Sequence, residues 1–223
     1  MSIWVILITV MIASAIIQAV LNSKFEKYSQ VPGRLTGEET ALKMLRDNGI
    51  YDVKVAEVDG ILTDHYNPAT KTINLSSAVF GTNSVAAEAV AAHETGHAIQ
   101  HAMGYAPLRL RSALVPVVNF SNMAVSWVLL LGVLLIEVTP SILWIGIGLF
   151  AMTTLFSFIT LPVEINASAR AVKWLERDGI VSYETKPMAV DALRWAAYTY
   201  VIAAIGSLAT LLYYIAIANG RRR

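Results

Sequence analysis

The sequence contains no cysteine, which excludes disulfide bonds and cysteine-ligated metal sites. Charged residues are also scarce: they make up 15% of the chain, whereas 56% of its residues are hydrophobic. Because an ordinary soluble domain carries about 25% charged residues, this composition predicts a membrane protein. The net charge is only +1 and the chain has neither a phosphate-binding loop nor a nucleic-acid signature, so we expect no nucleic-acid partner.

Four uncharged stretches are each long enough to cross a hydrocarbon core of about 30 Å as a helix. They are residues 3–21, 114–136, 142–161 and 196–218. The second is the least regular, because Pro116 and several polar residues interrupt its start. No basic residue precedes the first stretch, and Lys24 and Lys27 follow it, which favours an uncleaved anchor over a signal peptide.

The positive charges predict the orientation of these spans. Every Lys and Arg except Arg221, Arg222 and Arg223 lies in residues 22–113 or 162–195, and the turn at 137–141 has none. The positive-inside rule therefore places both polar segments in the cytoplasm. The tail at 221–223 disagrees with this topology. Either the tail is tolerated outside, or the last stretch is re-entrant, or the number of spans differs by one.

These patterns predict a mainly α fold, in which multi-pass membrane helices carry a small α+β domain. The expected segments are an anchor (1–22), a cytoplasmic segment (23–113), a transmembrane hairpin (114–161), a cytoplasmic helical segment (162–195) and a final span with a basic tail (196–223).

The cytoplasmic segment 23–113 has its own local signals. Thr36 and Glu39 form a capping box for a short helix, and residues 53–58 and 71–75 have the pattern of strands. We expect an extended substrate to pair with an exposed strand edge here, beside the helix that follows.

That helix carries the most informative motif, His93-Glu94-Thr95-Gly96-His97, which has the form HExxH. Two histidines four residues apart share one helix face and suit a single zinc ion. Asn83 or Ser84 can cap the start of the helix, and Gly104 can end it. The sequence thus predicts a zinc site with Glu94 beside the metal, and we expect residues 23–113 to form a small α+β zincin-like catalytic domain.

A catalytic zinc of this type needs a third protein ligand. On a straight helix His101 lies about 12 Å along the axis from His93, which is too far for both to reach one ion. Glu164 is the favoured candidate, because it opens a helical pattern on the side of the membrane where His93 is expected. It could instead be a solvated carboxylate at a helix start. The other carboxylates that could substitute for it are Glu88, Glu176 and Asp191.

Four stretches, at residues 62–68, 91–101, 104–112 and 161–164, resemble the YugP-type neutral zinc metallopeptidases of bacterial membranes. The resemblance covers nearly the whole chain in order. It implies a zinc peptidase of a bacterial cell membrane with His93, His97 and Glu164 as ligands and Glu94 as the catalytic residue. More distantly, the arrangement is similar to the integral-membrane gluzincins of the prenyl-protein-protease type.

Those gluzincins have an aspartate where Ser168 stands here, so the residue that orients the zinc histidines stays open among Asn166, Ser168 and a residue elsewhere. The motifs predict metal-assisted hydrolysis of peptides or membrane proteins with Glu94 as the general base. His65 and Arg170 are candidate donors to the reacting carbonyl oxygen. His65 and Tyr66 lie in a turn-rich segment, where a surface position is an equal alternative.

Two other classes of function stay open from the residues alone. The first is a non-hydrolytic membrane scaffold with a structural zinc, although such a site has no need of Glu94. The second is a transporter, which the lack of ionisable residues in the second and third spans disfavours. The sequence does not indicate whether the chain forms a homo-oligomer or binds a partner protein.

Overall fold

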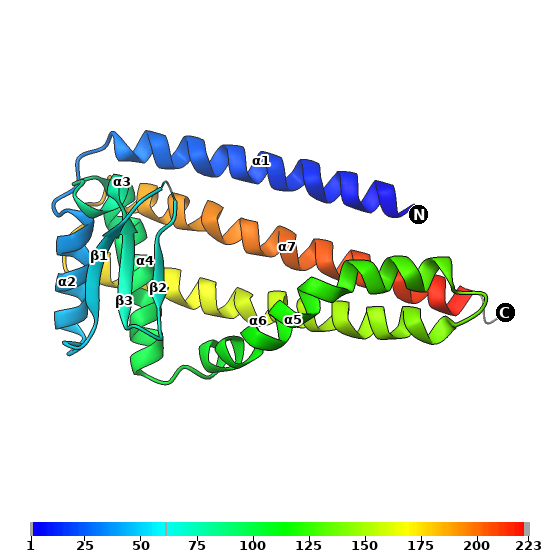
Figure 1. The fold of residues 1–223 in the computed structure, drawn as a ribbon. Coiled ribbons are helices and arrows are strands. Elements are labelled where there is room, and N and C mark those ends of the chain that lie inside the picture. The colour runs from blue at the N-terminus through cyan, green and yellow to red at the C-terminus, as the bar shows by residue number, and fades with distance from the viewer. Residues whose placement is uncertain (1, 61, 221–223) are drawn as a thin grey trace. The chain divides into compact units, whose positions relative to one another are not determined.

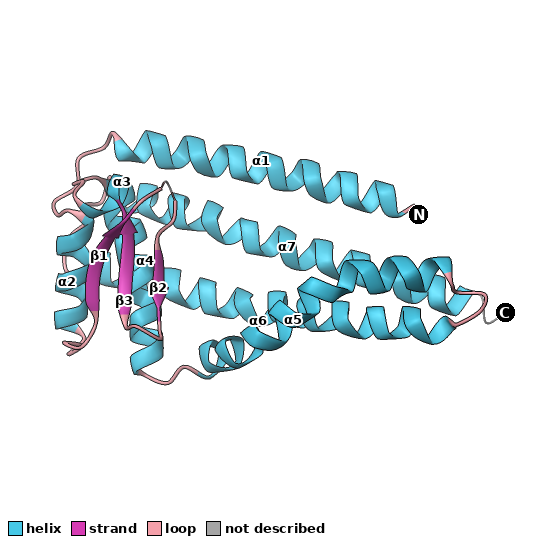
Figure 2. Cartoon of the chain, in the orientation of Figure 1, coloured by secondary structure: helices cyan, strands magenta, loops and turns pink. Residues whose placement is uncertain are grey.

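The computed structural model describes residues 2–60 and 62–220, so the basic tail Arg221–Arg223 lies outside the described residues. Figure 1 follows the chain, in which helices predominate (Figure 2). The elements are, in order, α1 (Ile3–Ser29), α2 (Gly37–Asp47), β1 (Lys54–Val58), β2 (His65–Asn67), β3 (Thr72–Ser76), α3 (Ser77–Phe80), α4 (Val85–Ala102), α5 (Ala106–Leu134), α6 (Pro140–Arg177) and α7 (Lys186–Gly220).

Four of the described helices, α1, α5, α6 and α7, are long and apolar enough to cross a membrane. Together with the small sheet they confirm the predicted fold class, which is mainly α with a small α+β part. The chain divides into two compact units. The first comprises the described residues of Met1–Ile16, Arg109–Leu161 and Thr199–Arg223, and the second comprises Ile17–Leu108 and Pro162–Tyr198.

Close helix contacts hold the first unit together. Any side chain at Gly132 of α5 would meet the backbone of Leu143 of α6, because a Cβ there would lie 2.6 Å from the Leu143 Cα. Pro116, which seemed to interrupt the second span, lies inside the continuous helix α5. The interruption that the sequence indicated is therefore not a break in the helix.

Helix α2 of the second unit starts at the predicted capping box. The Thr36 side chain accepts a hydrogen bond from the Glu39 N–H at 3.2 Å, and the Glu39 carboxylate accepts one from the Thr36 N–H at 2.9 Å. The two bonds satisfy backbone donors that a helix start would otherwise leave unpaired, so α2 begins at Gly37.

A three-stranded sheet follows, with the strand order β1-β3-β2. β1 and β3 are parallel, and β2 is antiparallel to β3 with Tyr66 opposite Ile73. The strand predicted at 71–75 is therefore central and has no free edge. The sheet has two edge strands, β1 and β2. β2 was not predicted as a strand, because it has only three residues and lies between the turn-forming residues Asp64 and Pro68.

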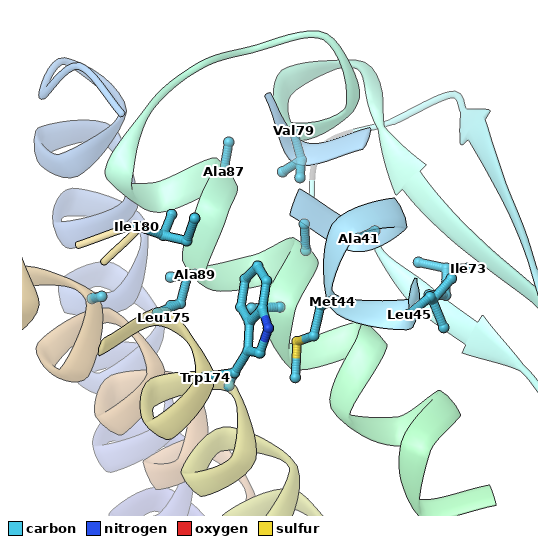
Figure 3. Packing of buried hydrophobic residues seen from close by; sticks show 14 of the residues in the cluster. Ala41, Met44, Leu45, Ile73, Val79, Ala87, Ala89, Trp174, Leu175 and Ile180 are labelled. Atoms are coloured by element: carbon cyan, nitrogen blue, oxygen red, sulfur yellow. The ribbon is translucent and has the colours of Figure 1, made fainter. Parts of the chain in front are cut away.

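The core of this unit brings together residues from α2, α3, α4, α6 and the sheet (Figure 3). Met44 and Leu45 of α2, Ile73 of β3, and Trp174 and Leu175 of α6 are all buried in it. Asp47 accepts a hydrogen bond from the indole N–H of Trp174 at 2.9 Å. The packing thereby fixes α6 against the elements that flank α4.

Helix α6 runs without a break from Pro140 to Arg177, through Pro162. Glu164 therefore lies inside a long helix, so the expectation that it opens a helix was wrong, and so was the alternative of a solvated carboxylate at a helix start. Its position is determined by packing between helices.

Met44→Ala should destabilise the second unit by about 2–5 kcal/mol, because it leaves a cavity in a closed core. Met103→Ala is the matched control: Met103 is 68% exposed and Met44 is 1% exposed, so the control should cost less than about 0.5 kcal/mol. Urea-induced loss of the helical circular dichroism signal, recorded in detergent micelles, measures both. Equal midpoints for the two variants would contradict the described core.

Candidate metal centre

Three potential metal ligands meet where α4 contacts α6. The Nε2 atoms of His93 and His97 lie 3.3 and 3.4 Å from Oε2 of Glu164; the side chains of His97 and Glu164 are buried and that of His93 is partly buried. Each offers one ligand atom, and the three atoms all lie within 4.8 Å of one another. The structure therefore brings together the two histidines of the motif and the glutamate that the sequence favoured.

The two separations between the histidine nitrogens and the Glu164 oxygen fit a zinc ion. Tetrahedral zinc holds nitrogen and oxygen ligands at about 2.0–2.2 Å, which places neighbouring ligand atoms about 3.3–3.5 Å apart. The two measured separations lie in this range and exceed those of good hydrogen bonds. Lone pairs that converge in a buried place repel one another unless a cation lies between them, so the donor set suits a divalent metal.

Each histidine is also held through its second ring nitrogen. Ser168 Oγ lies 3.0 Å from Nδ1 of His93, and Oε1 of Gln100 lies 3.1 Å from Nδ1 of His97. Ser168 was one of the orienting residues that the sequence left open. Asn166, another of them, contacts Gln100 at 3.0 Å. Such contacts leave the Nε2 atoms to face the metal position.

Gly96 permits the close approach of the two helices. A Cβ at Gly96 would lie 2.7 Å from the carbonyl oxygen of Ala167, a contact that real Cβ atoms do not make. Glu164 lies three residues before Ala167, about one helical turn away. Glycine at this place in α4 thus lets Glu164, the third ligand, come within reach of His93 and His97.

Glu94 is buried beside this cluster and is fixed by the edge strand. Its Oε2 accepts a hydrogen bond from the Tyr66 N–H at 3.0 Å. Because that N–H belongs to β2 and points to α4, it takes no part in the ladder with β3. The free edge of β2 therefore lies directly against Glu94.

Burial and the neighbouring carboxylates shift the pKa of His97 in opposite directions. Burial alone would lower the pKa of this imidazole, but its contact with Glu164 and the charge of Glu94 raise the pKa above its ordinary value. The two carboxylates thus create a negative potential at the cluster, which favours a cation there.

Two candidates for the oxyanion donor lie outside the three-residue cluster. His65 is exposed on β2, where Nδ1 is 2.8 Å from the Thr63 carbonyl oxygen and Nε2 is 3.2 Å from the Asn74 amide nitrogen. Arg170 donates from Nε to Oδ1 of Asn166 at 2.8 Å. Their proposed role on a substrate stays a prediction.

The other predicted alternatives have partners elsewhere. Glu88 is buried and accepts hydrogen bonds from the N–H groups of Arg34 and Leu35, and burial raises its pKa despite these bonds. Lys186 contacts Glu176, and Lys24 contacts Asp191 at 2.8 Å. None of these three carboxylates belongs to the described cluster around His93 and His97.

Tyr66 and His101 contact each other. The Tyr66 hydroxyl lies 2.8 Å from Nδ1 of His101, so His101 contacts the edge strand. Burial and the charge of Asp52 raise the pKa of the Tyr66 hydroxyl. His101 is not part of the described cluster of His93, His97 and Glu164, as its spacing from His93 predicted.

Sequence reasoning missed Gly96 and Gln100, although both had a local signal. A glycine inside a helix costs about 1 kcal/mol relative to alanine, which points to a close contact. Gln100 follows His97 by three residues, a spacing at which helix side chains touch.

The fold and this cluster define a class of protein: a membrane-helix protein with HExxH on one helix and a metal-competent glutamate on a later one. Comparison with known proteins agrees. The chain belongs to the family described as "Putative neutral zinc metallopeptidase", whose model matches residues 3–219. The resemblance seen in the sequence is thereby confirmed, and zinc is the metal that the family description names.

One curated relative is the "Putative membrane protease YugP" of Bacillus subtilis (strain 168). It is 44% identical over 205 residues, which cover 90% of each chain. No solved structure matches this chain.

Gly96→Ala should weaken zinc binding at least about 10-fold, because the added Cβ forces α6 and Glu164 away from the histidines. Gly81→Ala is the control, since nothing lies within 4 Å of a Cβ at Gly81. Competition with a chromophoric chelator measures both affinities. Parent-like zinc affinity in Gly96→Ala would show that the helix contact does not set the metal site.

Proposed function

We propose that this protein is a membrane zinc metallopeptidase in which His93, His97 and Glu164 bind the metal and Glu94 is the general base. The observation that carries the proposal is the convergence of two imidazole nitrogens and a carboxylate oxygen, with Glu94 on the same helix turn as His93 and His97. Three protein ligands leave the fourth position of a tetrahedral zinc ion for water, as catalytic sites require.

Zinc, when bound, would lower the pKa of a water ligand towards about 7 and polarise the carbonyl of the scissile bond. Glu94 would accept the proton of the attacking water and pass it to the leaving amine. The Tyr66 N–H supports this role, because it holds one oxygen of this carboxylate in place before a peptide binds. Ser168 and Gln100 would keep the ligand imidazoles oriented.

The substrate would be an extended peptide segment aligned along the free edge of β2. An edge strand offers backbone N–H and C=O groups to any added strand, and here the edge adjoins Glu94. Glu164 lies only three residues beyond the apolar stretch that ends at residue 161. This proximity favours membrane proteins, cut close to the membrane, as substrates.

We place the active site on the cytoplasmic face of a bacterial membrane. The support is the distribution of Lys and Arg, which are concentrated in residues 22–113 and 162–195 and absent from the turn at 137–141.

Glu94→Gln should retain zinc and lose activity by about 10²-fold or more, because the change spares the ligands and removes the base. Glu164→Ala should instead lose zinc. Hydrolysis of casein and zinc content by plasma emission spectrometry separate the two effects. Glu176→Gln, which alters a carboxylate paired with Lys186, is the control and should change neither.

Each result has a clear consequence. Full activity of Glu94→Gln would contradict the mechanism. If the parent protein binds zinc tightly yet hydrolyses neither casein nor unfolded membrane proteins, the non-hydrolytic scaffold with a structural zinc is the correct function.

The orientation has a separate test, for which the cysteine-free chain is well suited. Single cysteines at Tyr51 and Tyr183, which are 81% and 96% exposed, should resist an impermeant maleimide in intact cells. A cysteine at Val138, in the turn between α5 and α6, should be labelled. The opposite pattern would place the active site outside.

A further inference from the structure

Gln100 is fully buried in α4, one turn beyond His97, and all of its polar groups are engaged. Its Oε1 lies 3.1 Å from Nδ1 of His97. Its Nε2 donates to the Val163 carbonyl oxygen at 2.8 Å and to Oδ1 of Asn166 at 3.0 Å. One amide thus connects a ligand on α4 with the residues on either side of Glu164 on α6.

The orientation of this amide follows from chemistry. A backbone carbonyl such as that of Val163 can only accept a hydrogen bond, and the guanidinium of Arg170 can only donate one. Arg170 donates to the Asn166 side chain at 2.8 Å, so the Asn166 atom in that contact is its oxygen. Two acceptors therefore face the Gln100 nitrogen, and a flipped amide would place its oxygen against both.

The same logic fixes the tautomer of His97. With its nitrogen turned to α6, Gln100 presents its oxygen to Nδ1 of His97. An amide oxygen only accepts, so Nδ1 carries a proton, and in the neutral ring Nε2 therefore keeps its lone pair. That lone pair is on the atom that lies 3.4 Å from Glu164.

We propose that Gln100 is a positioning residue, which sets the tautomer of His97 and ties it to the helix that carries Glu164. The inference rests on the proposed function insofar as His97 and Glu164 are metal ligands. The contacts place Gln100 behind the histidine ring, so it acts through His97 and does not touch the metal or a substrate. Arg170 and Asn166 support it by fixing the direction of the amide.

Gln100→Met tests the proposal, because methionine has a similar size and neither donor nor acceptor of comparable strength. In the metal-free protein, at a pH high enough for the histidine rings to be neutral, ¹⁵N NMR should show the proton of His97 leaving Nδ1 for a mixture of tautomers. Only four histidines are present, which keeps the spectrum simple. Zinc affinity should fall about 10- to 100-fold, as for loss of a group that orients a ligand.

Gln100→Glu provides a second variant if the methionine protein does not fold. Its carboxylate still accepts from Nδ1 of His97, so the tautomer should be that of the parent, whereas the contacts with Val163 and Asn166 are lost. Gln30→Met, at an exposed glutamine, is the matched control and should change neither readout.

An unchanged Nδ1–H tautomer in Gln100→Met, with zinc affinity within about twofold of the parent, would overturn the proposal. So would a shift of the proton to Nε2 in Gln100→Glu. Neither readout depends on hydrolysis: a parent protein that binds zinc through His97 but cleaves no substrate would refute the proposed function and leave this inference standing.

Discussion

The close contact between α4 and α6 is the constraint on which the site depends. His93 and His97 share a face because they are one turn apart on one helix, but Glu164 comes from a helix much later in the chain. Its carboxylate reaches them because Gly96 lets the Ala167 carbonyl approach the backbone of α4. Further along α6, Trp174 and Leu175 pack into the core formed with α2 and α4. The packing that stabilises the second unit and the geometry of the metal centre are therefore one set of contacts.

This contact also has an electrostatic cost. It brings a buried carboxylate, one buried and one partly buried imidazole, and a buried amide to a junction that is otherwise lined by small and apolar side chains. Gln100 and Ser168 compensate part of the cost through hydrogen bonds, but the atoms that face one another between His93, His97 and Glu164 are a negatively charged oxygen and two nitrogens. A divalent cation removes their repulsion, so metal binding and the docking of α6 on α4 should stabilise each other.

Features that depend on short sequence spacing were predictable. The Thr36 capping box, the HExxH helix with its cap at Ser84, and the four apolar helices follow from local patterns, and the structure contains them. The edge strand β2 was not predictable, because three residues next to turn formers carry no strand period. The sequence and the family resemblance named Glu164, but its geometry depends on a contact between distant residues. Gln100 was missed although it lies three residues from His97, since its other two partners lie on α6.

In the proposed function, the edge strand β2 joins substrate binding to catalysis. In the described structure the Tyr66 N–H is bonded to Glu94, and this N–H is also a group that a peptide added to the edge of β2 would use. A peptide that pairs with β2 would therefore compete with Glu94 for one donor. The carboxylate that loses this bond must find another partner, because it is buried and charged. A zinc-bound water would be that partner, so binding of an extended peptide would turn Glu94 from a group held by the strand into a base directed at this water.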